Sequence, residues 1–166
     1  MSEVAATGAP YRLELAAEVR AWHEIGGLVR RLTTDERLEP GYYRDPDWAV
    51  RDVAAHLGTW LAEADRQFHQ MAAGTYAGHD VDVDGLNAAL LQAMRDQPWD
   101  VVWSQANAAR TMLLEAWMSL TVETAEAGWW IEKSGPVHYA EHLPRLRAWV
   151  EELIGRRVAE DRPEEA

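Results

Sequence analysis

Three histidines carry the chemistry that the sequence predicts most directly. His138 and His142 are four residues apart, and this spacing places both imidazoles on one side of an α-helix. His56, far upstream in the chain, is a candidate third ligand. Three neutral nitrogens with an open fourth position are typical of a catalytic metal site, since structural zinc sites are closed by four protein ligands. The pattern therefore predicts a metal centre at His56, His138 and His142.

Other interpretations of these histidines stay open. A His-x-x-x-His pair on a surface helix arises often by chance, and a lone histidine near a core is usually just hydrogen-bonded. Residues 138–142 also match the His-x-x-Glu-His pattern of inverted zinc proteases, but only twenty-four residues follow His142. Pro144 favours a functional site, because a proline inside a helix costs about 3 kcal/mol and is tolerated where a site gains from the distortion. The remaining histidines are expected to be solvated: His23, His69 and His79.

Two carboxylates near His56 in the sequence are candidates for proton transfer or for orienting its imidazole. Asp52 lies four positions before His56, and Glu63 lies seven positions after it, on nearly the same helix face. Alternatively, Asp52 stabilises the first turn of its helix and Glu63 is a solvated carboxylate. Arg51 and Arg110 are candidates for receiving a substrate carboxylate, although arginines on helices are usually surface residues.

Composition narrows the class of protein. The chain has 166 residues, no cysteine and a formal net charge of −12, so it is expected to form one domain, residues 1–166, without disulfides or a cysteine nucleophile. Sixteen basic residues scattered among carboxylates make a nucleic-acid partner unexpected. No apolar run approaches the roughly 20 residues that span a bilayer, and no targeting signal opens the chain. A cytoplasmic protein without a membrane partner is expected.

The hydrophobic pattern predicts an all-α fold. Apolar residues recur at helical spacing in four regions, whose approximate ranges are 11–32, 47–74, 85–120 (interrupted at Pro98) and 134–155. Asp47 is expected to cap the second helix and Ser134 the last, and a long connection covers 74–84. The packed core should span about 11–154 between polar tails. Four such units predict a four-helix bundle, whose metal sites are built from facing helices.

The segments that carry the histidines resemble a known family. Residues 48–57, 83–87 and 138–143 read WAVRDVAAHL, VDGLN and HYAEHL. In this order they resemble the DinB-like superfamily, especially its mycothiol-dependent maleylpyruvate isomerase N-terminal-domain branch. The resemblance implies an up-down-down-up four-helix bundle that holds zinc or nickel at His56, His138 and His142. In that topology the second and last helices run oppositely, so His56 and His138, both near helix beginnings, meet only if the helices cross or are displaced along their axes.

Three functions are compatible with these residues. The preferred hypothesis is a metal-dependent enzyme that activates an external low-molecular-weight thiol, such as mycothiol or bacillithiol, for S-transfer to a small electrophilic substrate or for its isomerisation. A metal-water hydrolase of the same superfamily is the second, and a module that binds a metal or ligand without turnover is the third. A homodimer is compatible with the sequence, which does not determine the oligomeric state.

Overall fold

Most of the described residues lie in helices, which confirms the all-α prediction. The computed structural model describes residues 10–44, 47–78 and 80–162. The helices are α1 (Arg12–Arg30), α2 (Thr34–Leu38), α3 (Val50–Ala73), α4 (Val83–Met94), α5 (Trp99–Met118), α6 (Ala125–Ser134) and α7 (Pro136–Glu160). A short antiparallel ladder joins β1 (Tyr43–Arg44) to β2 (Asp47–Trp48). The predicted polar tails at 1–9 and 163–166 lie outside the described residues.

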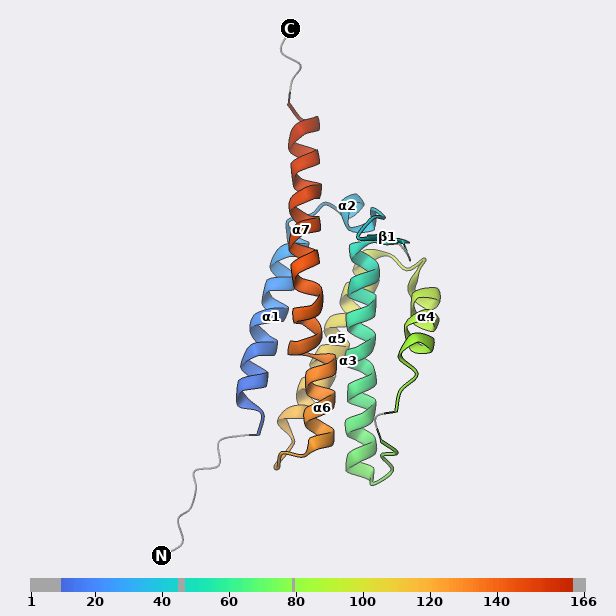
Figure 1. Cartoon of the computed structure of the whole chain (residues 1–166), viewed down its shortest axis with the longest axis vertical. Coiled ribbons are helices and arrows are strands. Elements are labelled where there is room, and N and C mark those ends of the chain that lie inside the picture. Colours follow the sequence, from blue (N-terminus) through green and yellow to red (C-terminus); the bar gives the residue numbers. More distant parts are fainter. Residues whose placement is uncertain (1–9, 45–46, 79, 163–166) are drawn as a thin grey trace, which may run out of the picture.

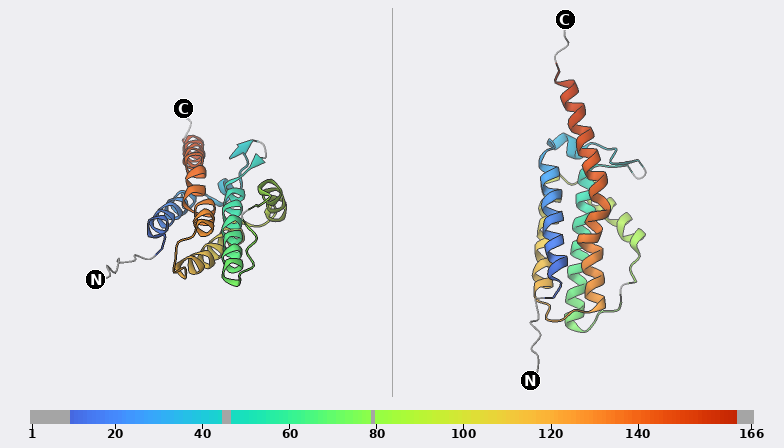
Figure 2. Two further views of the ribbon diagram at one scale, coloured as in Figure 1. Left: turned by 60° about the horizontal axis from the view of Figure 1, so that its bottom comes forward. Right: turned by 60° about the vertical axis from the view of Figure 1, so that its left-hand side comes forward.

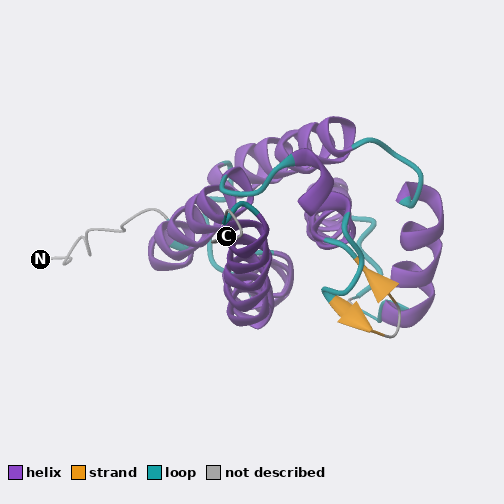
Figure 3. Cartoon of the chain, turned by 90° about the horizontal axis from the view of Figure 1, so that it is seen from above, coloured by secondary structure: helices purple, strands orange, loops and turns teal. Residues whose placement is uncertain are grey.

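The long helices lie side by side along one axis (Figure 1). α3 and α5 pack closely and run in one direction, whereas α1 and α7 run in the other. α6 and α7 follow each other end to end, as the second view in Figure 2 shows. Seen along the axis, α4 lies outside the other long helices and beside α3 (Figure 3). None of the described helices has both the length and the apolar composition that crossing a membrane requires.

The second predicted helix is the best-defined element, and its apolar stripe is buried as expected. Six stripe residues are fully buried: Val50, Val53, Leu57, Leu61, Ala64 and Phe68. The expected cap is wrong, because Asp47 lies in β2 and the helix begins three residues later. Asp52 pairs a backbone group at the start of the helix instead: its carboxylate accepts a hydrogen bond from the backbone N–H of Ala49 at 2.8 Å.

The first helix follows its predicted stripe only in part. Trp22, Ile25, Leu28 and Val29 are buried, but Leu13 is 82 % exposed. Glu18, a carboxylate, takes an interior position in the first half of this helix. Its burial depends on partners that lie far away in the sequence, as described for the site below.

The predicted third helical region consists of two separate helices. Pro98 ends the connection after α4, and α5 starts at the next residue, as a proline without an amide N–H allows at a helix start. α4 begins slightly earlier than expected, because the Asp82 side chain accepts a hydrogen bond from the backbone N–H of Gly85. α4 contributes no fully buried residue, whereas α5 buries one face against α3.

α6 is a helix that the sequence pattern did not predict. Thr124 caps its start by accepting a hydrogen bond from the backbone N–H of Ala127. Ser134, expected to cap the last helix, is the last residue of α6, and its hydroxyl donates to the carbonyl of Trp130. The helical path is interrupted between α6 and α7 at Gly135. An added Cβ at this position would lie 2.8 Å from the carbonyl oxygen of Ile131, so the turn requires a glycine. α7 then continues past the expected end at 155.

Candidate metal centre

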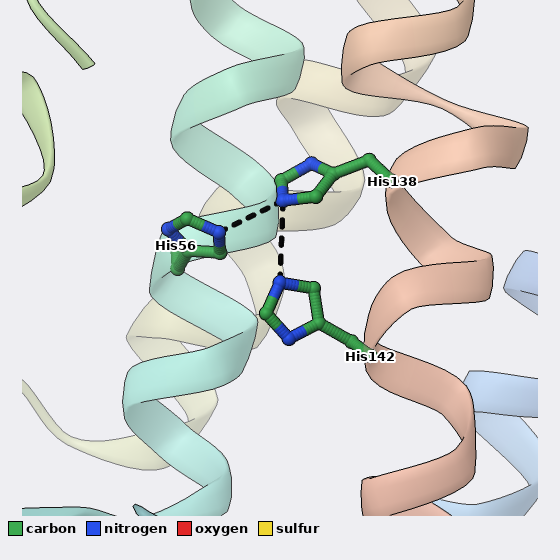
Figure 4. A group of neighbouring side chains, drawn as sticks. All are labelled: His56, His138 and His142. Carbon is green, nitrogen blue, oxygen red and sulfur yellow. Dashed lines mark hydrogen bonds between the residues drawn. The ribbon is translucent and has the colours of Figure 1, made fainter.

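The three predicted histidines converge at one point between α3 and α7 (Figure 4). The Nε2 atom of His138 lies 2.8 Å from Nε2 of His56 and 3.2 Å from Nε2 of His142. His138 is buried, and the other two imidazoles are half-buried. The predicted clustering of these side chains is therefore confirmed.

The unpredicted helix α6 explains how His56 and His138 meet. α3 and α7 run in opposite directions, and His56 lies two turns into α3 while His138 lies in the first turn of α7. α6 occupies the stretch alongside the lower half of α3, so that α7 starts partway along the bundle instead of at its end. Of the two arrangements that the resemblance left open, crossing helices or displacement along the axis, the ten residues of α6 supply the displacement.

The spacing of the three nitrogens fits a single metal ion. Ligands at about 2.0–2.1 Å from a tetrahedral ion lie roughly 3.3 Å from one another. The two Nε2 distances from His138 are close to this value, and all three candidate ligand atoms lie within 4.8 Å of each other. A single Nε2–H on His138 donates well to only one of its two neighbours. A cation among the three nitrogens accepts all three lone pairs, so the residues present fit a metal.

The electrostatics of the cluster keep the imidazoles neutral, as metal ligation requires. Burial, together with the charges of His56 and His142, lowers the pKa of His138 to about 2. Burial and the charge of His142 lower the pKa of His56 to about 4. A hydrogen bond with the side chain of Asn87 acts in the opposite direction and raises this pKa. Burial also lowers the pKa of His142, although Glu141 opposes the shift. Lone pairs are therefore available at neutral pH.

Two residues outside the predicted set contact imidazoles of the cluster. The Tyr43 hydroxyl lies 3.3 Å from Nδ1 of His142, and the side chain of Asn87 in α4 hydrogen-bonds to His56. Such partners orient metal-binding imidazoles and set their tautomer. Nδ1 of His138 is buried and has no hydrogen-bond partner within the described part of the chain. Asn87 belongs to the VDGLN segment, so the motif contained a signal for it, whereas nothing in the sequence pattern pointed to Tyr43.

Tryptophans surround the cluster. Trp48 packs against His56 with ring centroids 5.3 Å apart, and Trp60 packs edge-on against His138 at 5.9 Å. The indole N–H of Trp60 donates to Asn87 at 3.1 Å, which ties α4 to α3 beside the centre. A cavity of about 10 Å³ adjoins His56, and this is room for about one water molecule.

The predicted carboxylates are engaged elsewhere. Asp52 is buried at the start of α3, where it accepts the Ala49 N–H and pairs with Arg51, although it also lines the small cavity beside His56. Glu63 accepts hydrogen bonds from Arg66 and Gln67 on its own helix. Among the described residues, neither carboxylate hydrogen-bonds to an imidazole of the cluster.

Arg110, a candidate for receiving a substrate carboxylate, is paired inside the protein. Its guanidinium donates two hydrogen bonds to Glu18, at 2.6 and 2.7 Å, and the Tyr139 hydroxyl donates a third to the same carboxylate at 3.1 Å. This network joins α1, α5 and α7 next to His138. It explains the burial of Glu18 and engages the guanidinium of Arg110 with an internal carboxylate.

The other histidines lie outside the cluster. His23 and His69 are exposed, although Nδ1 of His69 lies 2.9 Å from the carbonyl oxygen of Asp65, and His79 falls outside the described residues. Comparison of the chain with protein-family models, curated proteins and solved structures found no match.

Proposed function

We propose that this protein is a metal-dependent enzyme in which His56, His138 and His142 hold one divalent ion. The observation that carries the proposal is the convergence of three Nε2 atoms from two helices at a partly buried point. Zinc is the first expected ion and nickel the second, because neutral imidazoles suit both metals. Three protein nitrogens leave a coordination position for a substrate or water.

We also assign the chain to the DinB-like type of four-helix bundle. Two features support this assignment: the motifs at 48–57, 83–87 and 138–143, and the directions of the long helices. α1 and the α6–α7 pair run one way while α3 and α5 run the other, which is the up-down-down-up order, with the long connection and α4 between α3 and α5.

The proposed reaction is activation of a low-molecular-weight thiol, of the mycothiol or bacillithiol kind, for S-transfer to a small electrophile or for isomerisation. When bound, a divalent ion lowers the pKa of a coordinated thiol or water and polarises a carbonyl. The three imidazoles add no negative charge, so both positive charges of the ion remain available for this task. The residues around them have a positioning role: Tyr43 and Asn87 fix the ring orientations.

The hydrogen bonds that Asp52 and Glu63 already make favour a thiol over water as the group that the metal activates. A metal-water hydrolase gains from a group that moves protons near the metal, and Asp52 and Glu63 are engaged in other hydrogen bonds. A free thiol has a pKa of about 8.5, against 15.7 for bulk water, so metal coordination alone brings it closer to ionisation at neutral pH.

Access for a thiol requires a movement at α4. The cavity beside His56 holds about 10 Å³, too little for a substrate. α4 covers this side of the centre and packs there through partly buried residues only, among them Leu86, Leu91 and Met94, so it is held less firmly than helices with fully buried residues. Breaking the hydrogen bond between Trp60 and Asn87 is part of that movement.

Metal content is the first test. Protein purified after metal-replete expression should contain about one divalent ion per chain by elemental analysis. His142→Ala should lose most of it, and His23→Ala, which changes an exposed histidine of α1, should keep it. Full metal content in His142→Ala would refute the centre.

Turnover then separates the reaction classes. Fully metallated protein is incubated with mycothiol, bacillithiol or glutathione and an epoxide, a chloronitrobenzene or maleylpyruvate, with and without chelator. Product that needs both metal and thiol supports the proposal. Product that needs metal but no thiol identifies a hydrolase. Metal-loaded protein that binds these compounds without product would identify a binding module.

A further inference from the structure

A second, larger cavity is lined by residues near the C-terminal ends of α3 and α5 and by the segment that leads into α6. Figure 1 shows that these parts of the chain lie together at one end of the bundle. The cavity has a volume of about 510 Å³, within the range of about 300–1,000 Å³ that is usual for small-molecule sites. Its walls are mainly apolar and include Phe68, Met71 and Leu120. It shares no lining residue with the histidine cluster, so it is a separate candidate site.

One buried carboxylate lines this cavity. Asp65 is only 7 % exposed, and its Oδ1 atom has no hydrogen-bond partner among the described residues. The Nδ1 atom of His69 lies 3.5 Å from this carboxylate oxygen. Its hydrogen bond, however, is made with the backbone carbonyl oxygen of Asp65, at 2.9 Å. A buried carboxylate oxygen without a donor is costly, and native proteins rarely keep one without a reason.

The remaining polar lining makes the cavity attractive to a cation. Glu115 adds a second carboxylate, and none of the described lining residues is a lysine or an arginine. Met112 and Val122, at the edge of the cavity, are 54 % and 63 % exposed. Large apolar side chains at the edge of a cavity are a common sign of a binding surface. The site thus combines an apolar wall, an apolar rim and negative charge.

We propose that this cavity binds a small amphiphilic amine. The ammonium group pairs with the Asp65 carboxylate, and a small rotation of that side chain exposes the enclosed Oδ1 atom to this donor, so that a charge-assisted hydrogen bond forms. The hydrocarbon body of the ligand covers Phe68, Met71 and Leu120 and removes their surface from water. Anions of the same shape are repelled by Asp65 and Glu115. This proposal does not depend on the function of the metal centre.

Three probes of nearly equal shape test the charge preference: phenylbutylamine, phenylbutanol and phenylbutyrate. Isothermal titration calorimetry at neutral pH should show the amine binding at least about tenfold more tightly than the alcohol, a difference that needs only about 1.4 kcal/mol. The carboxylate should bind most weakly. Equal affinity for the amine and the carboxylate would overturn the proposal.

Variants locate the interaction. Asp65→Asn keeps the side-chain shape and should reduce amine affinity to that of the alcohol, at least about tenfold, while alcohol binding is unchanged. Asp100→Asn, an exposed change at the other end of α5 with the same effect on net charge, should leave all three affinities unchanged. An amine preference that survives in Asp65→Asn would contradict the proposed contact.

Two further measurements separate ligand binding from a structural role. Ala72→Phe places an aromatic ring in the cavity from an exposed position and should abolish binding of the amine and the alcohol. Chelator-treated protein should bind the amine as well as metallated protein does. Without ligand, Asp65→Asn should raise the melting temperature, because it removes an unpaired buried charge. A lower melting temperature would show that the carboxylate has a stabilising partner inside the protein and would contradict the argument.

Discussion

Acidification of the metal-free protein from pH 7 to pH 5 should lower its free energy of unfolding by about 4 kcal/mol through two histidines. Burial and neighbouring imidazoles lower the pKa of His138 to about 2 and that of His56 to about 4 in the folded chain. The unfolded chain has ordinary values of about 6.5. The unfolded state therefore binds protons that the folded state does not, and stability falls as the pH drops through 6.5 toward 4.

The magnitude follows from integrating this difference in bound protons. Between pH 7 and pH 5 each of the two histidines contributes about 2 kcal/mol. This is a large part of the roughly 5–15 kcal/mol that stabilises a typical domain. The lowered pKa of His142 acts in the same direction. Carboxylates with lowered pKa, such as Glu63, titrate below this window, so they contribute little to the change.

Urea denaturation followed by tryptophan fluorescence, with chelator present, measures the effect at both pH values. His138→Gln should lose about 2 kcal/mol less than the wild type between pH 7 and pH 5, because one of the two titrating groups is gone. His23→Gln, an exposed control, should behave as the wild type does. If His138→Gln and the wild type lost equal stability, the imidazole of His138 would not be held neutral by its surroundings, and the reasoning would fail.

Three further changes test the packing and the residues around the centre. Gly58→Ala should lower the free energy of unfolding by about 1 kcal/mol, because the new Cβ lies 2.8 Å from the backbone of Ala106 and the overpacking outweighs the gain in helix propensity; a more stable variant in urea denaturation would contradict the contact between α3 and α5. Tyr43→Phe should weaken zinc affinity about tenfold with unchanged circular dichroism, because His142 loses the hydroxyl at its Nδ1 atom; competition with a chromophoric chelator measures this, and unchanged affinity would remove Tyr43 from the site. Asp52→Ala should lower the free energy of unfolding by about 1 kcal/mol through loss of the hydrogen bond at the start of α3; loss of turnover in stable, metal-loaded protein would instead assign it a proton-transfer role.

The sequence alone determined those features that depend on residues close together in the chain. The apolar spacing in α3 and in α7 predicted which faces are buried, because residues three and four apart share one side of a helix. The same geometry predicted that His138 and His142 point to one place. The addition of His56 rested on its residue type and on the motif resemblance, and the structure brings it to the other two.

Tertiary structure decided the features that depend on residues far apart in the chain. Glu18 is interior because Arg110 and Tyr139, each about a hundred positions away, supply its three hydrogen bonds. Asp52 and Glu63 share a helix with His56, but nearby donors engage both carboxylates. Periodicity cannot anticipate these pairings, because it describes one helix at a time.

The meeting of the three histidines shows both contributions. Helical spacing placed each imidazole on the correct face of its helix, but not at the correct height along the bundle. That height is decided by α6, a short helix that buries Ala127, Trp130 and Ile131, packs against α3 and α7, and sets the start of α7 beside His56. Spacing along the chain thus determined the ligand types and faces, and packing between distant segments determined that they form one site.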